Sequence, residues 1–233
     1  MIVEAIQHQD QPPLLLFSSS ISVYGDRIQD YWIRVGDPLK PSRGDYYAEL
    51  KIQCEQLIQA ASIPYVIFRL TGIMGYPTAD PLMFHMPLDT HLEFASNCDT
   101  GFALAKAVQH RQELEGRIFN LGGGEGFRIT YRSFIKNMLS IYGLNPCYLR
   151  QECFATKNFH CGYYADSDEL NDILHFQRDN LDSYYARTLL ATARPVYLIN
   201  RLFGWLILRY LQHHSDPYQA LRHHDQDLID RFY

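Results

Sequence analysis

The segment Leu14-Leu-Leu-Phe-Ser-Ser-Ser-Ile-Ser-Val-Tyr-Gly-Asp26 is the most informative part of the chain about its fold. Its first part is a short continuous apolar run, which is typical of a strand buried on both faces in a parallel sheet. Three serines end the run, and a polar, proline-bearing loop continues to Pro41. Ligands of open α/β sheets bind beyond the carboxyl ends of the strands. We therefore expect the hydroxyl of Ser20, just past the apolar run, to face such a site.

Downstream of this stretch, apolar runs alternate with segments of helical periodicity. Tyr65-Val-Ile-Phe68 is a second buried-strand candidate, and Arg117-Ile-Phe-Asn-Leu121 is a third. Helices are predicted over residues 2–8, 45–61, 100–110 and 131–142. Strands alternating with helices predict βαβ units and a parallel sheet, so the fold class is α/β. Residues 130–233 are predicted to form a smaller, mostly helical part.

The predicted helix over residues 45–61 has two distinguishable faces. Apolar side chains recur at three- and four-residue spacing and are expected to face the core. They are Leu50, Cys54, Leu57, Ile58 and Ala61. Gln53, Gln56 and Gln59 are expected on the outer face.

The bulk composition excludes several classes of protein. The chain has 233 residues, 47% hydrophobic and 20% charged, and a net charge of −5, so no electrostatic footprint for nucleic acid exists. Five cysteines without a CxxC pair do not form a disulfide framework, which favours a reducing, cytoplasmic location. The first residues, Met1-Ile-Val-Glu-Ala5, lack the charged and apolar regions of a signal peptide.

One late segment, residues 196–211, is apolar enough to suggest a membrane. It is too short and, with Asn200, Arg201 and Arg209, too polar to span a bilayer, so no stable membrane insertion is expected. A helix packed on the body of the protein is the preferred interpretation, and an interfacial helix is the alternative. The aromatic residues Tyr197, Phe203, Trp205 and Tyr210 are expected to form core or a partner interface.

Tyr47 and Lys51 are four residues apart, so on a helix they share one face. A tyrosine phenol is a poor base at neutral pH, and a neighbouring ammonium group favours its phenolate form. Such a phenol exchanges a proton with a substrate hydroxyl, while a serine hydroxyl holds the same oxygen in line. Taken alone, the pair is a weak signal, and a surface i,i+4 contact is the preferred interpretation.

The ordered set of these features resembles the extended short-chain dehydrogenase/reductase family of NAD-dependent epimerases and dehydratases. That family reads apolar strand, Ser-Ser-x-x-x-Tyr-Gly, loop, Tyr-x-x-x-Lys, helix, strand and Arg-Pro-x-x-x-x-Gly. This chain has Ser19-Ser20, Tyr24-Gly25, Tyr47, Lys51 and Arg69 in that order. The resemblance covers roughly residues 1–140 and extends to Asp99-Thr100 and Ile118–Gly123.

The resemblance implies roles for individual residues. Ser20, Tyr47 and Lys51 would be the catalytic set, with Tyr47 as general acid/base and Lys51 binding the nicotinamide ribose. Leu70, Gly72 and Ile73 would line the nicotinamide. Residues 1–129 would form a partial NAD(P)-binding Rossmann-like domain and residues 130–233 a substrate-binding cap.

The glycine-rich turn that cradles the cofactor pyrophosphate in this fold has no counterpart here. Neither G-x-G-x-x-G nor G-x-x-G-x-x-G occurs, and the cluster Gly122-Gly123-Gly124 follows the third predicted strand rather than the first. A turn is favoured for the cluster, and a phosphate-binding role is the alternative. We therefore expect a truncated chain with impaired NAD or NADP binding, an open edge on its first strand and no activity in isolation.

The substrate is left open by the sequence. Gly72 and Asn97-Cys98 stand where many sugar-nucleotide members carry Asn and Arg, which weakens a nucleotide-sugar assignment. The expected function is an NAD(P)-dependent epimerase, dehydratase or reductase acting on a sugar-like or secondary alcohol. The alternative is a catalytically inactive remnant or interaction subunit. The family also implies a homodimer through the helix that carries Tyr47.

The histidines and the aromatic segment 158–166 are two further candidates for ligand binding. The histidines, among them His160, His213-His214 and His223-His224, lack zinc-ligand spacing, so no metal is expected. Asn158-Phe-His-Cys-Gly-Tyr-Tyr-Ala-Asp166 could line a substrate pocket, but a packed aromatic loop is the favoured interpretation.

Overall fold

The computed structural model describes residues 2–75 and 80–233. Met1, part of the N-terminal stretch assessed above, lies outside these residues. The described chain divides into two compact units. The first comprises residues 2–75, 93–128 and 160–179, and the second comprises residues 80–92, 129–159 and 180–233. One junction lies next to the boundary expected at residue 129, but the units are not contiguous in sequence, since the chain passes between them several times.

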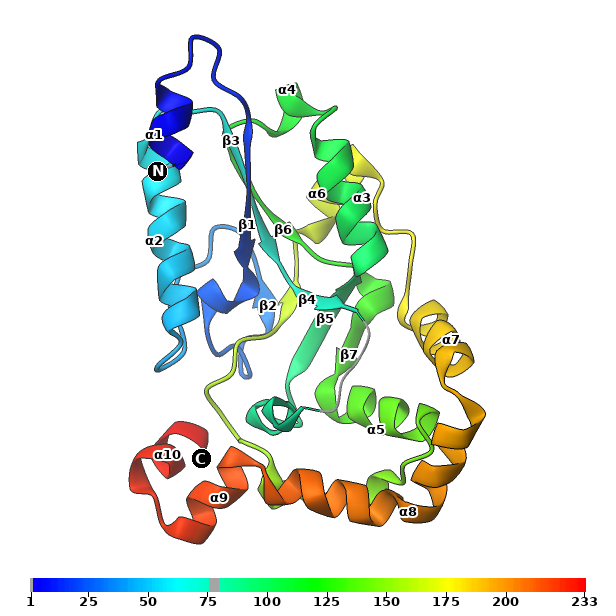
Figure 1. Ribbon diagram of the computed structural model, residues 1–233. Helices are drawn as coiled ribbons and strands as arrows, with labels where there is room; N and C mark the ends of the chain where they lie inside the picture. The colour runs from blue at the N-terminus through cyan, green and yellow to red at the C-terminus, as the bar shows by residue number, and fades with distance from the viewer. Residues whose placement is uncertain (1, 76–79) are drawn as a thin grey trace. The chain divides into compact units, whose positions relative to one another are not determined.

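A parallel sheet forms the centre of the first unit (Figure 1). Its strands β1 (Leu15–Ser20), β3 (Tyr65–Leu70) and β6 (Arg117–Leu121) lie in the order β1-β3-β6. The register places Ser20 beside Leu70 and Leu70 beside Leu121, so the carboxyl ends of the three strands meet at one edge. The predicted parallel α/β arrangement is therefore confirmed.

Burial differs strongly between the central and outer strands. In β3, Val66, Ile67, Phe68 and Arg69 are all buried, as expected for a central strand. The apolar residues of β1 are only half buried, because among the described residues β1 pairs with β3 alone. The prediction that β1 is covered on both faces is wrong for the chain by itself, and the expectation of an open, apolar edge agrees with this exposure.

Helix α2 (Tyr46–Ala60) follows β1 and runs alongside the sheet (Figure 1). Its first turn is capped by Asp45, whose carboxylate accepts a hydrogen bond from the backbone N–H of Ala48 at 3.0 Å. The buried positions of the helix are Ala48, Glu55 and Ile58.

The face of α2 that was predicted to be buried is largely exposed. Leu50 and Leu57 are 59% and 43% exposed, and Cys54 is also exposed. The inward face is instead set by a carboxylate, Glu55, which binds an arginine of β3. An apolar-face count misses this because it scores any glutamate as solvent-facing.

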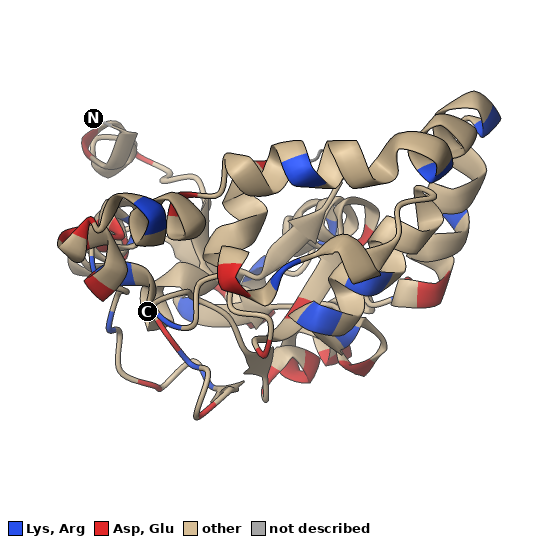
Figure 2. Ribbon diagram, turned by 90° about the horizontal axis from the view of Figure 1, so that it is seen from below, with Lys and Arg blue, Asp and Glu red and all other residues tan. Residues whose placement is uncertain are grey.

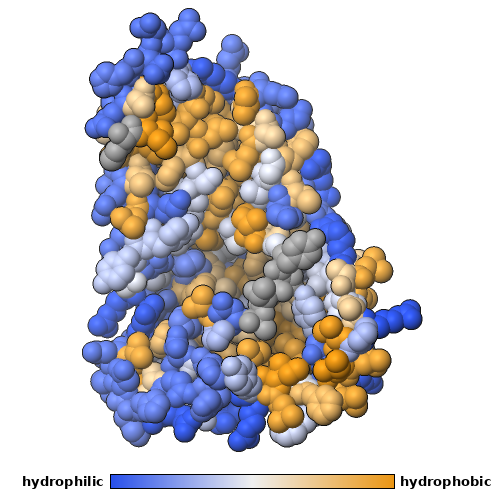
Figure 3. All heavy atoms as spheres, viewed as in Figure 1, coloured by the Kyte–Doolittle hydropathy of each residue, from blue (hydrophilic) through white to orange (hydrophobic). Residues whose placement is uncertain are grey.

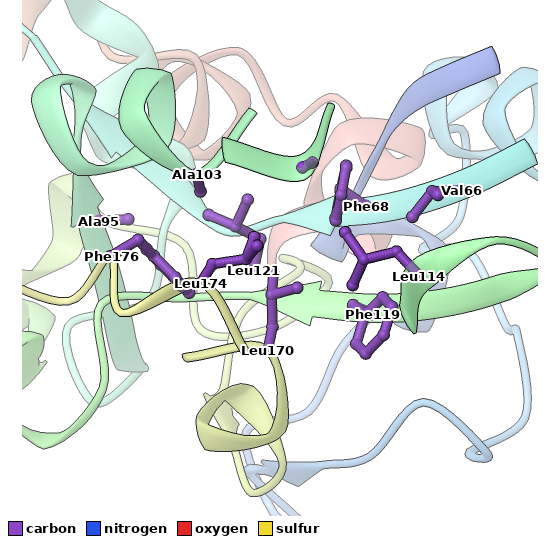
Figure 4. Close-up of a cluster of buried hydrophobic side chains, with 11 residues drawn as sticks. Val66, Phe68, Ala95, Ala103, Leu114, Phe119, Leu121, Leu170, Leu174 and Phe176 are labelled. Carbon is purple, nitrogen blue, oxygen red and sulfur yellow. The ribbon is translucent and has the colours of Figure 1, made fainter. Parts of the chain in front are cut away.

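The main hydrophobic core lies on one side of the sheet (Figure 4). It joins Phe68 of β3 and Phe119 of β6, whose rings are 6.3 Å apart, to α3 (Asn97–Ala107) and α6 (Ser167–Leu174). From α3 the core includes the small side chain of Ala103, and from α6 it includes Leu170 and Leu174. Burial of this apolar area is the dominant stabilising term for the unit.

Shorter elements complete the first unit. Helix α1 (Ile2–Gln7) precedes the sheet, and α4 (Arg111–Leu114) precedes β6. Strand β4 (Gly72–Met74) pairs in parallel with β5 (His91–Ser96), and β2 (Trp32–Ile33) pairs in parallel with β8 (Tyr163–Tyr164). Strand β7 (Arg128–Thr130) lies at the junction of the units.

The second unit is mainly helical. Its helices are α5 (Tyr131–Ile141), α7 (Leu181–Ala191), α8 (Arg194–His213), α9 (Asp216–His223) and α10 (Gln226–Phe232). Side-chain caps begin several of them: Thr130 starts α5, Asn180 and Ser183 form a capping box on α7, and Ser215 starts α9. Within the described part of the chain, no helix combines the length and apolar character that crossing a bilayer requires.

Candidate active site

Ser20 lies at the carboxyl end of β1, where the chain leaves the sheet. Its backbone is extended, with φ −146° and ψ 151°, and its Oγ accepts a hydrogen bond from the backbone N–H of Ser22 at 3.1 Å. This bond caps the short 3₁₀ helix Ile21–Tyr24. Because the bond uses a lone pair of Oγ, the hydroxyl hydrogen can still be donated to another oxygen.

Tyr47 and Lys51 lie on the first two turns of α2, and the structure brings them together. The Nζ of Lys51 is 5.5 Å from the ring centroid of Tyr47 and 4.9 Å from that of Phe17. It donates a hydrogen bond to the carbonyl oxygen of Ser18 at 2.7 Å. Lys51 is therefore held against β1, two residues before Ser20. The side chain of Tyr47 is more than half exposed.

Leu70 is the last residue of β3 and lies beside Ser20 in the register, and Gly72 and Ile73 follow it as the start of β4. Leu70 is half buried and Ile73 is 39% exposed. A Cβ at Gly72 would lie 3.0 Å from the ring of Phe94, so the backbone passes close to that side chain. These residues therefore lie at the same edge of the sheet as Ser20.

A buried polar network lies behind this edge. The two terminal nitrogens of Arg69 on β3 bind different partners: Nη2 donates to Glu55 of α2 at 2.7 Å, and Nη1 donates to the hydroxyl of Tyr24 at 2.7 Å. Glu55 also accepts a bond from the hydroxyl of Ser19 at 2.5 Å. The network thus joins β1, the 3₁₀ turn after it, α2 and β3 through side chains that are all nearly inaccessible to solvent.

The same network reaches the third strand of the sheet. The hydroxyl of Tyr24 donates to the side-chain oxygen of Asn120 on β6 at 2.8 Å, and the amide of Asn120 donates to Asp166 at 2.8 Å. The second oxygen of Asp166 accepts a bond from the backbone N–H of Val35 at 2.7 Å. All three strand ends are therefore cross-linked by polar side chains.

Burial controls the ionisation of the groups in this network. Burial raises the pKa of Tyr24 to about 12, against the opposing effect of the Arg69 charge. Burial by itself would lower the pKa of Arg69, but its hydrogen bonds with Glu55 and the nearby Tyr24 raise it overall. Tyr24 is therefore a neutral donor and Arg69 a permanent cation, which suits a structural role better than proton transfer.

Sequence reasoning missed most of this network. The sequence identifies Arg69, Tyr24 and Asn120 only as parts of family landmarks and Asp166 only as part of a possible pocket lining, and it predicts no role for Glu55. One signal was available: Glu55 is four residues after Lys51 and eight after Tyr47, so it shares their helix face. Its partners lie 14 to 36 residues away along the chain, and spacing alone does not identify them.

The glycine cluster after β6 is packed against side chains and does not offer a phosphate cradle. A Cβ at Gly122 would lie 2.2 Å from the carboxylate of Glu93, and one at Gly123 would lie 2.3 Å from the ring of Phe127. The backbone N–H of Gly123 already donates to the carbonyl of Phe94, and that of Gly124 donates to Glu93. The favoured interpretation of the cluster as a turn therefore agrees with the structure.

Glu93 is another deeply buried carboxylate of the first unit. It pairs with Arg128 at 2.8 Å and accepts bonds from the hydroxyl of Ser167 and the backbone N–H of Tyr164. Burial raises the pKa of Glu93, and the pairing with Arg128 opposes this rise. These bonds tie β5 to the segment before α6.

Residues 160–166 form packed structure in the first unit. Tyr164 is fully buried beside Tyr24 and Ile33, and its hydroxyl donates to the carbonyl of Arg69 at 3.0 Å. Burial raises the pKa of the Cys161 thiol well above its usual range. Within residues 2–75 and 80–233, no group of three or more histidine, cysteine or acidic side chains is arranged to hold a metal ion.

Comparison with known proteins places the fold. No protein-family model matches the sequence, and no curated protein matches it. Among solved structures, dTDP-glucose 4,6-dehydratase from Bacillus anthracis, in complex with NAD, aligns with a TM-score of 0.65 at 15% identity over 81% of this chain. UDP-glucuronic acid 4-epimerase from Bacillus cereus aligns with a TM-score of 0.61 at 18% identity over 82%. A short-chain dehydrogenase/reductase superfamily protein from Agrobacterium tumefaciens aligns at 0.56, with 16% identity over 81%.

The alignments cover only part of each solved enzyme. The chain spans 64% of the dehydratase, 65% of the epimerase and 69% of the Agrobacterium protein. At these identities the likeness concerns the fold. Together with the β1-β3-β6 parallel sheet, it shows that this chain has a Rossmann-like α/β fold similar to that of these solved structures.

Proposed function

We propose that the chain carries the catalytic edge of an NAD(P)-dependent epimerase, dehydratase or reductase that acts on a secondary alcohol, such as that of a nucleotide sugar. The observation that carries the proposal is the contact of Lys51 with both β1 and Tyr47, beside the strand end that bears Ser20. The solved enzymes of this fold include a dehydratase described with NAD and an epimerase described with NAD and UDP-glucuronic acid. Both act on nucleotide sugars by name.

In this proposal each residue has one task. The hydroxyl of Ser20 donates a hydrogen bond to the substrate oxygen and orients it. The phenol of Tyr47 exchanges a proton with that oxygen, and the ammonium group of Lys51 favours the phenolate form that accepts the proton. The bound dinucleotide would supply the hydride acceptor or donor. The exposure of Tyr47 supports this role because a substrate can approach the phenol.

The residues present fit the nicotinamide and its ribose better than the pyrophosphate and adenosine of the dinucleotide. Lys51 uses one N–H on the Ser18 carbonyl, which leaves two ammonium hydrogens for ribose hydroxyls. Leu70, Gly72 and Ile73, at the same edge, would contact the nicotinamide. The only glycine cluster is filled by Glu93 and Phe127, so it offers no site for the pyrophosphate. We therefore infer weak binding of NAD or NADP to these residues alone.

The test compares nicotinamide mononucleotide with NAD, using the full chain and calorimetry or saturation-transfer NMR. We expect similar, weak affinity for both ligands, because the adenosine half gains no contact. Lys51→Met should weaken both about tenfold or more, since it removes a charge-assisted donor. Lys106→Met on α3, which changes a lysine that is half-buried like Lys51, is the matched control and should leave binding unchanged. Unchanged binding in Lys51→Met would sink the proposed site.

Catalysis is tested separately, by measuring turnover of dTDP-glucose or UDP-glucuronic acid with the full chain and NAD at high concentration. Any turnover should fall about a hundredfold or more in Tyr47→Phe, because general acid–base catalysis contributes at least that much. Tyr46→Phe, its exposed neighbour, should retain the rate. Equal rates in the two variants would remove Tyr47 from the mechanism.

A second candidate, an inactive remnant or interaction subunit, is favoured by one observation. Strand β1 offers a half-buried apolar edge that pairs on one side only among the described residues. Such edges recruit further strands. Absence of any nicotinamide binding to the wild-type chain would favour this candidate.

A further inference from the structure

Helix α8 exposes a broad apolar face. It packs into the second unit through Gly204, Leu208, Leu211 and Gln212. The opposite side carries large apolar residues that stay accessible, among them Leu202 at 70% exposed and Trp205 at 49%. The end of α7 extends this area through Leu190, which is 86% exposed. Figure 3 shows apolar atoms gathered over this part of the second unit.

The helix is therefore apolar on both sides, unlike an ordinary surface helix. A surface helix has one apolar stripe and a charged opposite face, whereas a helix that is apolar all round is buried in a protein core or in a membrane. Isolated exposed apolar residues need no explanation, but a contiguous patch of this kind marks an interaction site. Of the two expectations for Phe203, Trp205 and Tyr210, core or a partner interface, the exposure of each side chain excludes core.

The charged side chains that this part of the sequence itself carries are all positive. Between Asp182 and Asp216 the sequence has four arginines and no aspartate, glutamate or lysine, although the whole chain has a net charge of −5. Arg194, Arg201 and Arg209 of α8 are exposed, and among the described residues no carboxylate lies within ion-pair distance of them. Figure 2 draws Lys and Arg in blue and Asp and Glu in red, and the longest helix in that view carries blue segments.

Arg194 and Arg201 lie on one flank of the apolar face, and Arg209 lies within it, between the directions of Leu198 and Leu202. Arg194 and Arg201 are seven residues apart, which returns to nearly the same direction at about 100° per residue. Trp205 follows Arg201 by four residues and lies on the same flank. A strip of arginine and tryptophan beside leucine and phenylalanine is the composition of helices that lie in a membrane interface.

We propose that α8 lies in the headgroup region of a bilayer that contains anionic phospholipid, with its apolar face toward the acyl chains. A spanning arrangement does not fit, because no described helix is long and apolar enough. A second copy fits poorly, because a two-fold contact through this face would bring the unpaired arginines of both copies together. Anionic headgroups, by contrast, complement Arg194, Arg201 and Arg209.

The first experiment is flotation of the purified full chain with vesicles of phosphatidylcholine, with and without phosphatidylserine. We expect binding that requires phosphatidylserine and weakens at high salt. Replacing Arg194, Arg201 and Arg209 by glutamine should lower the partition coefficient about fivefold per arginine. Leu202→Glu should lower it about tenfold or more, because it places a carboxylate in the apolar face.

The matched control is Val108→Glu in the first unit. Val108 is 66% exposed, close to the exposure of Leu202, and the substitution adds the same charge. Its binding should equal that of the wild type. Circular dichroism and urea unfolding test whether each variant is folded. We expect both to fold, because Leu202 and Val108 are exposed and neither supports the core.

The second experiment reports the depth of the helix. The chain has two tryptophans, Trp32 and Trp205, so Trp32→Phe leaves Trp205 as the single reporter. Its fluorescence should shift to the blue on vesicle binding and be quenched by brominated acyl chains. Lack of binding to phosphatidylserine vesicles overturns the proposal. So does a wild-type dimer that Leu202→Glu converts to a monomer, which would assign the face to a second copy.

Discussion

Glu55 connects the candidate catalytic helix to the sheet. It lies on α2 between the turn that carries Lys51 and the end of the helix, and its carboxylate binds Ser19 of β1 and Arg69 of β3. Both partners in the Glu55–Arg69 pair are almost fully buried. A buried ion pair adds little relative to a well-packed apolar pair, but removing one partner leaves an uncompensated charge in the interior.

Glu55→Gln should therefore lower the free energy of unfolding by about 3 kcal/mol or more. The contrasting variant is Glu115→Gln, which breaks the exposed pair between Arg111 and Glu115 and should cost about 1 kcal/mol or less. Urea denaturation of both variants measures the difference. Equal losses would show that Arg69 finds another partner when Glu55 is neutral.

At the scale of elements, the turn after β6 depends on glycine for space. Gly123 lies so close to its surroundings that an added Cβ would approach the carbonyl oxygen of Phe94 to 2.5 Å, in addition to the ring of Phe127. Because the carbonyl belongs to the backbone of β5, the contact cannot be relieved by a rotamer change. The close packing of Gly123 against Phe94 thereby holds the carboxyl end of β6 next to β5.

Gly123→Ala should destabilise the protein by about 1–3 kcal/mol through this overpacking. Gly101→Ala is the opposite case, because Gly101 lies inside α3 with no atom near the added Cβ. It should stabilise by about 0.5–1 kcal/mol, since alanine loses less backbone entropy in a helix. Thermal and urea unfolding of the two variants should show opposite signs, and a common sign would contradict this account.

Helix α2 also presents an outward apolar surface, which bears on assembly. Leu50 and Leu57 are exposed on it, and we propose a homodimer through this helix. Leu57→Glu should convert the dimer to monomers, because it places a charge in the buried contact. Sedimentation velocity measures this, with Val108→Glu as control. A wild-type chain that sediments as a monomer at high concentration would refute the dimer.

At the scale of the whole molecule, stability should depend on alkaline pH through Tyr24. Burial raises the pKa of Tyr24 to about 12, whereas an unfolded tyrosine titrates near 10. A raised pKa means that the folded state favours the protonated phenol. Its contribution is therefore fully present below about pH 10 and is lost as the pH rises through about 12.

The advantage of the wild type over Tyr24→Phe should therefore shrink by about 2–3 kcal/mol between these pH values. Comparing the two proteins removes the effect of the other tyrosines, which titrate in both. Urea unfolding across the alkaline range measures the free energies. If the difference in free energy of unfolding between the wild type and Tyr24→Phe does not change with pH, then Tyr24 does not titrate differently in the folded and unfolded states.

The alternation of strands and helices can be predicted from the amino-acid sequence without the structure. The strand predicted at Arg117–Leu121 matches β6, and the helix predicted over residues 131–142 differs from α5 by one residue. The pairing of Tyr47 with Lys51 and the position of Ser20 at a strand end also followed from local spacing. These features depend on residues within a few positions of one another, where backbone geometry fixes the direction of side chains.

Only the tertiary structure decided which faces are covered. The half-exposed β1, the inward Glu55 of α2, the filled glycine turn and the bare apolar side of α8 all depend on what packs against each element. Those partners are distant in the chain: Tyr24 and Asn120 bond across 96 residues. A periodic pattern states that a residue can be buried, whereas the free energy of burial depends on the neighbour that removes the water.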